Sequence, residues 1–174
     1  IAKFATELMQ GKTLEDLNFT KELIPNFQAV KEAVLPFKRF PGSDTLLGPE
    51  MRSTGEVMGL AKDFGIAYAK SELAAGNGVP TKGLAFLSTN DLDKSYLFEI
   101  ANDLTNLGFK LIATEGTSNY LSNLGIIVES VFKVHEGRPN IEDMIRSGLV
   151  QLVINTPIGS QALYDDQYLR RASL

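Results

Sequence analysis

Short apolar runs alternate with amphipathic stretches through the second half of the chain. The apolar runs are expected to be buried strands, and they cover residues 84–87, 109–113, 126–132 and 149–154. Between them, residues 97–107, 117–124 and 141–145 carry apolar side chains at helical spacing, and a last helix is expected to start near Gly159. This alternation predicts repeated βαβ units, and therefore an α/β fold with an open parallel sheet covered by helices on both faces.

The first half of the chain has a less regular pattern. It predicts the end of a helix at 1–10, a short helix opened by Thr13 and Asp16, a strand at 27–35, loops at 40–56 and a helix at about 61–75. The expected buried stripe of that last helix consists of Phe64, Ala67, Tyr68 and Leu73. Because residues 74–83 are rich in glycine, we expect a linker there and two domains, 1–78 and 79–174.

Composition excludes several classes of protein. The chain has 17 Lys and Arg against 21 Asp and Glu, a formal net charge of −4, which argues against a nucleic-acid partner. It has no cysteine and one histidine, which argues against disulfides and the usual metal sites and fits a cytoplasmic protein. No apolar run approaches the roughly 20 residues of a membrane span, so no membrane partner is expected.

Polar side chains and two lysines follow the ends of all four predicted strands. They are Ser88 and Lys94, then Thr114 and Thr117, then Lys133, and finally Asn155 and Thr156. Parallel strands present their carboxyl ends at one rim, where ligands bind, so we expect these residues to lie together. Hydroxyls, lysine charges and the start of a helix beside Gly116 suit a phosphate monoester, and Asn155 suits a sugar or base. The alternative is that the threonines only cap helices, as Thr117 is expected to do in either case, and that the lysines are only solvated.

No group of residues combines a nucleophile, a base and an orienting group, so no catalytic residue is assigned. We interpret His135, Glu136 and Arg138 as a structural loop, and Asp165 and Asp166 as the start of a solvated turn. The nucleotide-binding sequences GxxxxGK and GxGxxG and the hydrolase sequence GxSxG are absent.

Two stretches resemble the large subunit of carbamoyl-phosphate synthase. VKEAVLPFKRFPGSDTLLGPEMRSTGEVMG (30–59) is similar to the segment that closes its second ATP-grasp unit. Residues 83–174, with FLSTNDLDK, ATEGTS, KVHEGRPNIEDMIRSG and VINTPIGS, resemble its C-terminal allosteric domain, which has a methylglyoxal-synthase-like, Rossmann-like fold. The resemblance implies a C-terminal fragment: a mostly helical remnant of the ATP-grasp domain at 1–78, and an allosteric domain at 79–174 that lacks its last strand and helix.

The resemblance implies a regulatory role for this chain. The parent ligase makes carbamoyl phosphate for pyrimidine and arginine biosynthesis, and its ATP and magnesium ligands would lie upstream, so no cofactor or metal is expected here. Implied partners are the rest of the large subunit, the glutaminase small subunit, the nucleotide effectors UMP and IMP, and ornithine. The positions that match the family's nucleotide pocket are Ser88, Lys94, Thr114, Thr117, Lys133 and Asn155, and Glu32 matches a residue of the ornithine site. Pro157 replaces a threonine of some relatives, and Glu115 adds a negative charge to the phosphate loop.

Two other functions remain as alternatives. Methylglyoxal synthase shares the fold, but its histidine position is Asn90 here and HEGRPNI replaces its Gly-Gly-Asp segment, so phosphate elimination would lack an evident base. A purely structural role in docking subunits would leave the chain unresponsive to nucleotides.

Overall fold

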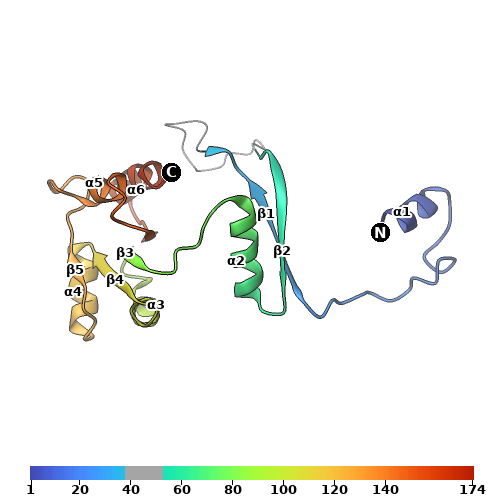
Figure 1. Ribbon diagram of the computed structural model, residues 1–174, viewed down its shortest axis with the longest axis horizontal. Coiled ribbons are helices and arrows are strands. Elements are labelled where there is room, and N and C mark those ends of the chain that lie inside the picture. Colours follow the sequence, from blue (N-terminus) through green and yellow to red (C-terminus); the bar gives the residue numbers. More distant parts are fainter. Residues whose placement is uncertain (38–52) are drawn as a thin grey trace.

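The computed structural model describes residues 1–37 and 53–174, and these residues form two separate β-sheets (Figure 1). The first part contains α1 (Ala2–Met9), β1 (Gln28–Val34), β2 (Gly55–Ala61) and α2 (Phe64–Ala75). The second part contains β3 (Gly83–Thr89), α3 (Lys94–Asn106), β4 (Phe109–Ala113), α4 (Glu115–Asn123), β5 (Glu129–Ser130), α5 (Ile141–Arg146), β6 (Leu152–Thr156) and α6 (Ser160–Ala172). Most of the loop predicted at 40–56 lies outside the described residues.

The second part is built on a parallel sheet with the strand order β5-β4-β3-β6. Strands β3, β4 and β5 follow one another across the sheet, and the chain then crosses back to place β6 on the other side of β3. The predicted α/β fold with a parallel sheet is therefore confirmed. The reversal of strand order at β3 is the kind of position at which open α/β sheets bind ligands.

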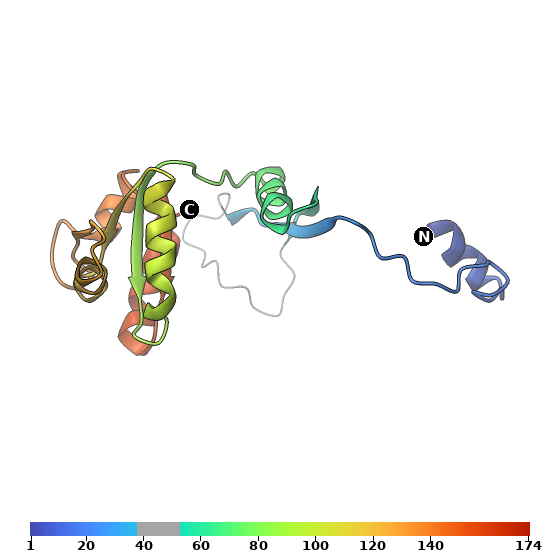
Figure 2. The same ribbon diagram turned by 90° about the horizontal axis from the view of Figure 1, so that it is seen from below.

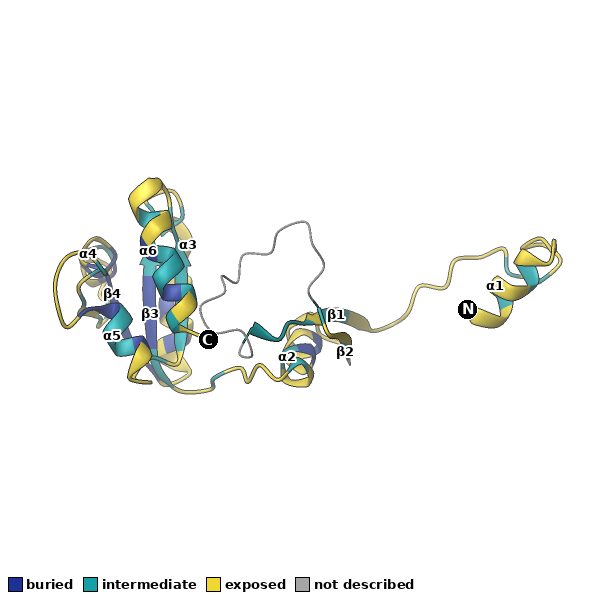
Figure 3. Cartoon of the chain, turned by 90° about the horizontal axis from the view of Figure 1, so that it is seen from above, coloured by how far each residue is buried: buried dark blue, intermediate teal, exposed yellow. Residues whose placement is uncertain are grey.

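Alternating side chains of the central strands supply two cores, one on each face of the sheet. Ala85 and Leu87 of β3 pack with residues of α3 and α4, such as Leu97 and Leu121. Phe86, between them in sequence, packs on the opposite face with residues of α5 and α6. Figure 3 shows β3 coloured as buried. The helices thus cover both faces and hold the carboxyl ends of the strands in fixed positions.

The first part contains an antiparallel pair, β1 and β2, against which α2 packs. Strand β1 confirms the prediction at 27–35, but β2 was missed and α2 starts at Phe64 rather than near Ala61. The predicted buried stripe of α2 is wrong except at Ala67, which is fully buried; Phe64, Tyr68 and Leu73 are exposed. Ala67 packs against β2, and its carbonyl oxygen lies where a Cβ on Gly59 would stand.

Several predicted boundaries also need correction. Helix α4 starts at Glu115 with Thr114 as its N-cap residue, so Thr117 lies inside the helix and does not cap it. Thr13 and Asp16 exchange the expected side-chain hydrogen bonds, but the residues after them form turns instead of a helix. The third strand is only Glu129–Ser130. Figure 2 shows an irregular connection from α2 to β3, where the linker was expected.

Candidate functional site

A cavity of about 410 Å³ lies at the carboxyl ends of the parallel strands. The residues predicted for a phosphate site all line it: Ser88, Lys94, Thr114, Thr117, Lys133, Asn155 and Thr156. They come from the carboxyl ends of β3 and β6, the first turns of α3 and α4, and the segments that follow β4 and β5. The structure therefore brings the two lysines into one cavity, as the strand-end argument expected. Pro157 also contributes to the lining, whereas Glu115 is not among the lining residues.

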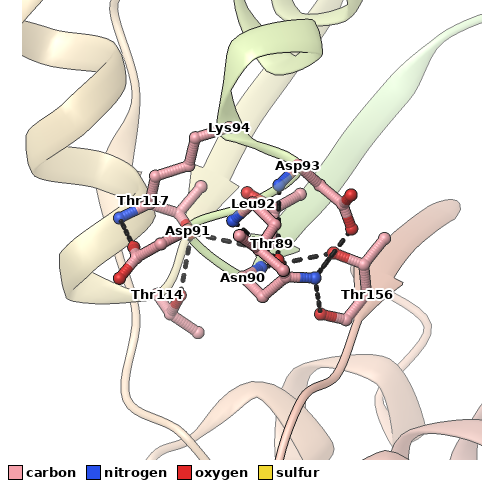
Figure 4. Close-up of polar contacts among 9 residues, drawn as sticks. All are labelled: Thr89, Asn90, Asp91, Leu92, Asp93, Lys94, Thr114, Thr117 and Thr156. Atoms are coloured by element: carbon pink, nitrogen blue, oxygen red, sulfur yellow. Dashed lines mark hydrogen bonds and ion pairs between the residues drawn. The ribbon is translucent and has the colours of Figure 1, made fainter.

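The first turn of α4 forms one wall of this cavity. Thr114 and Thr117 are both buried, and the Thr114 hydroxyl donates a hydrogen bond to Thr117 Oγ1 at 3.3 Å (Figure 4). Thr117 Oγ1 also accepts from the backbone N–H of Thr89 at 3.3 Å. Because both lone pairs of this oxygen are used, its own proton is left to donate to a ligand. A Cβ added at Gly116 would meet nothing within 4 Å, so an anion has room to approach the backbone N–H groups of this helix start.

Each lysine of the cavity is held beside a carboxylate. Lys94 Nζ lies 2.6 Å from Asp91 Oδ1, and the hydrogen bond and charge of Lys94 lower the pKa of the Asp91 carboxyl (Figure 4). Lys133 Nζ lies 3.5 Å from Glu136 Oε1, and the backbone N–H of Lys133 donates to Glu136 Oε2 at 2.8 Å. An incoming anion would therefore compete with Asp91 and Glu136 for the two ammonium groups.

A hydrogen-bonded network joins the loop after β3 to the carboxyl end of β6, and β6 to α6. The Asn90 side chain donates to the carbonyl and the hydroxyl oxygen of Thr156, both at 3.1 Å, and to Asp93 Oδ2 at 2.7 Å (Figure 4). The Asn155 amide donates to Asp166 Oδ1 at 2.7 Å. This leaves the second N–H and the carbonyl oxygen of the Asn155 side chain to meet a ligand. The Asn90 side chain thus forms part of the cavity wall. It is an uncharged amide, so it offers no acid or base for catalysis.

The interpretation of Asp165 and Asp166 as a solvated turn is wrong. Both lie within α6; Asp166 pairs with Arg170, and Asp165 is only 8% exposed. Asp165 and His135 line the cavity, and His135 Nδ1 lies 2.7 Å from Asp165 Oδ2. Sequence reasoning missed this pair because the two residues are 30 positions apart. The only available signal was helical spacing, which places Asp165 one turn after Gln161 on the face of α6 that lines the cavity.

Glu32 lies apart from this cavity, on β1. Burial, and then the negative charge of Glu72, raise the pKa of the Glu32 carboxyl. Its Oε2 atom is buried and has no hydrogen-bond partner among the described residues. A buried carboxylate oxygen without a partner is costly unless a donor or a cation reaches it.

Within residues 1–37 and 53–174, no three or more acidic, histidine or cysteine side chains are grouped so that they could hold a metal ion. No helix in these two ranges is long and apolar enough to span a membrane.

The class of domain follows from a family comparison. Residues 96–174 match the model of the MGS-like domain, and this region runs from α3 to α6. The chain therefore contains an MGS-like domain, and the cavity is lined by residues of this region and by residues between 86 and 94, which directly precede it.

Individual relatives identify the protein family more closely. The chain is 54% identical over 174 residues to the carbamoyl phosphate synthase large chain of Nostoc sp., covering 100% of this chain and 16% of that protein. It is 53% identical over 175 residues to the large chain of Synechocystis sp., with coverage of 100% and 16%. It is 50% identical over 175 residues to the arginine-specific large chain of Oryza sativa subsp. japonica, with coverage of 100% and 15%. The resemblance to the carbamoyl-phosphate synthase large subunit is therefore confirmed, although the chain spans only about a sixth of the length of these relatives.

Proposed function

We propose that the cavity binds the phosphate group of a nucleoside monophosphate, UMP or IMP, as an allosteric effector. One observation supports this most: two lysines, two threonine hydroxyls and the open start of α4 converge on a single cavity of about 410 Å³. A phosphate dianion matches this set, because lysines supply charge and helix starts supply unpaired N–H groups. Asn155 then lies where the rest of the nucleotide would extend.

The proposal gives the chain a regulatory place in a longer enzyme. By its relatives' names, that enzyme would be a carbamoyl phosphate synthase. The sequence resemblance further implies that ATP and magnesium bind outside this chain and that a glutaminase subunit is its partner, and the lack of cysteine fits the cytoplasm. The arginine-specific name of the rice relative is consistent with a role in arginine as well as pyrimidine biosynthesis. Ornithine is proposed as a second effector at Glu32, because its amino groups would suit the unpartnered carboxylate oxygen there.

The binding test compares the parent chain with two lysine variants. In the parent, UMP at about 100 times Kd should stabilise the fold by about 2.7 kcal/mol, which is a Tm rise of roughly 5–10 °C. Lys133→Ala should weaken UMP binding about tenfold to hundredfold, since it removes a charge-assisted hydrogen bond. The unliganded Tm should stay unchanged, because the contact with Glu136 is 3.5 Å long and partly exposed.

Lys110→Ala serves as the matched control. Lys110 is an exposed residue of β4 and does not line the cavity, so its removal should leave UMP binding intact. Calorimetric titration with UMP, IMP and ornithine measures affinity, and thermal unfolding measures the shift. The site assignment is wrong if Lys133→Ala responds to UMP as the parent does. A parent chain that binds none of the three compounds would favour the docking role, and methylglyoxal formation from dihydroxyacetone phosphate would favour the enzyme.

A further inference from the structure

A histidine–aspartate pair belongs to the cavity but has no place in the proposed phosphate site. His135 comes from the loop that also carries Lys133, and Asp165 comes from α6. The side chain of Asp165 is 11% exposed, whereas that of His135 is 45% exposed. A largely buried carboxylate therefore anchors an imidazole that remains accessible from the cavity.

The contacts of Asp165 determine which ring nitrogen meets a ligand. A carboxylate only accepts hydrogen bonds, so His135 Nδ1 carries the proton in the 2.7 Å contact with Asp165 Oδ2. Gln161 Nε2 donates to the other oxygen, Asp165 Oδ1, at 3.3 Å. The carboxylate is thus fixed from two sides, and it fixes the ring in turn. Nε2 is the nitrogen that remains for a ligand, and it can donate only when the ring is protonated.

We propose that His135 is a third anion-binding group of this cavity and that it takes up a proton when the anion binds. The inference rests on the proposed function and deepens it, because it makes the affinity for the effector depend on pH. Binding strengthens as the pH falls through the range in which imidazole titrates. Asp165 acts as the positioning residue that keeps the ring turned toward the cavity.

The charges around His135 favour this assignment. From its own loop, Lys133 pairs with Glu136 and Arg138 pairs with Asp143 of α5. Across the cavity, Lys94 pairs with Asp91.

Each of these cations already has a carboxylate, whereas Asp165 has only neutral donors while the imidazole is neutral. Protonation of His135 balances the charge of Asp165. It also removes a net negative charge from the wall that a phosphate would face.

The experiment uses the full chain and a probe whose own charge does not change. Sulfate is a dianion throughout the range in which imidazole titrates, whereas the phosphate of UMP itself titrates near pH 6. The chain has one histidine, so its imidazole proton signals in an NMR titration report His135 alone. The midpoint of that titration should move to higher pH when sulfate is added. By linkage, a tenfold gain in sulfate affinity at low pH corresponds to a midpoint shift of about one pH unit.

Calorimetry supplies the second readout. The parent should bind sulfate about twofold to fivefold more tightly at about pH 5.5 than at about pH 7.5, the range expected for one exposed ion pair. His135→Asn should remove most of this difference. Lys133→Ala should weaken sulfate binding at both pH values, because lysine stays charged throughout.

The outcomes separate this inference from the proposed function. If UMP and sulfate bind through Lys133 but the histidine signals and the pH profile do not respond, only the role of His135 is overturned. If neither anion binds at any pH, both proposals are overturned. The NMR measurement requires no variant, so it decides the question even if His135→Asn fails to fold.

Discussion

Asp91 and Glu136 make the cavity lysines unequal as anion ligands. Lys94 is 22% exposed and lies 2.6 Å from its carboxylate, whereas Lys133 is 44% exposed and lies 3.5 Å from its own. The Lys133 ammonium is therefore the more available of the two. Lys94 must first exchange Asp91 for the anion, which costs part of the binding free energy.

This competition predicts a gain of affinity on removing Asp91. Asp91→Asn should tighten UMP binding by about twofold to fivefold, the range expected for one exposed ion pair. Asp103→Asn removes the same charge from a residue of α3 that lies outside the cavity. This variant should therefore have little effect on UMP binding. Calorimetric titration of both variants against the parent measures the difference. Weaker binding in Asp91→Asn would show that the carboxylate positions Lys94 for the ligand instead of competing with it.

Glu32 should destabilise the unliganded fold at neutral pH. Burial, and then the charge of Glu72, raise its pKa above the ordinary value of 4.5, so the folded chain binds this proton more tightly than the unfolded chain does. Stability is therefore gained as the pH falls toward the ordinary value and lost as the pH rises through the folded pKa.

Glu32→Gln keeps the shape of the side chain without its charge. It should raise Tm at about pH 7 and have little effect at about pH 4, where the carboxyl is protonated in both states. Glu99→Gln, at an exposed position of α3, is the control for a general change in net charge. Thermal unfolding at both pH values is the measurement, and a lower Tm at neutral pH would contradict the argument.

Residues that follow strands could be predicted as a site, and residues that reach it through packing could not. Ser88, Thr114 and Lys133 stand next to apolar runs, so their common rim follows from parallel topology. His135 and Asp165 meet only because α6 packs against the face of the sheet that holds Phe86. Helical spacing places Asp165 on the same face of α6 as Gln161, but it does not show that His135 meets this face.

At the scale of elements, Gly59 decides how closely α2 packs on β2. A Cβ at this position would collide with the carbonyl oxygen of Ala67 and would lie 2.7 Å from the backbone nitrogen of Ser71. Because both are backbone atoms of α2, the helix would have to move. Gly59→Ala should lower stability by about 1–3 kcal/mol, as overpacking does.

Gly55 provides the comparison within the same strand. A Cβ there meets nothing within 4 Å, so Gly55→Ala should be nearly neutral. Hydrogen exchange of the α2 amides should be faster in Gly59→Ala and unchanged in Gly55→Ala. Equal exchange in the two variants would mean that α2 does not depend on this close approach.

Helices and strands could be predicted where the apolar residues followed a clear pattern along the sequence. Strands β3 and β4 are continuous apolar runs between helices, and their positions agree with the prediction. Strand β2 was missed because its sequence, GEVMGLA, carries two glycines and therefore resembles a loop. Most of its residues are exposed, so burial imposes no clear apolar pattern on it. The start of α4 was misplaced because Thr114, its N-cap residue, follows directly after Ala113, the last residue of β4, so no loop separates the strand from the helix.

At the scale of the molecule, the two proposed binding sites belong to different sheets. Every residue that lines the cavity falls between Phe86 and Leu169, whereas Glu32 belongs to the β1–β2 pair. Helix α2 packs against β1 and β2, and α3 to α6 pack within the second part. Among the described residues, the nucleotide site therefore uses no side chain from the first part.

A chain of residues 79–174 should bind UMP with a Kd within about threefold of the full chain, because the whole cavity and both of its cores are retained. Circular dichroism first establishes that the shorter chain is folded, and calorimetry then compares the two affinities. Lys133→Ala in the shorter chain should weaken binding as it does in the full chain. A folded shorter chain that has lost UMP binding would mean that residues 1–78 hold the cavity in its binding shape. The predicted boundary at 78 would then separate two parts of one site instead of two domains.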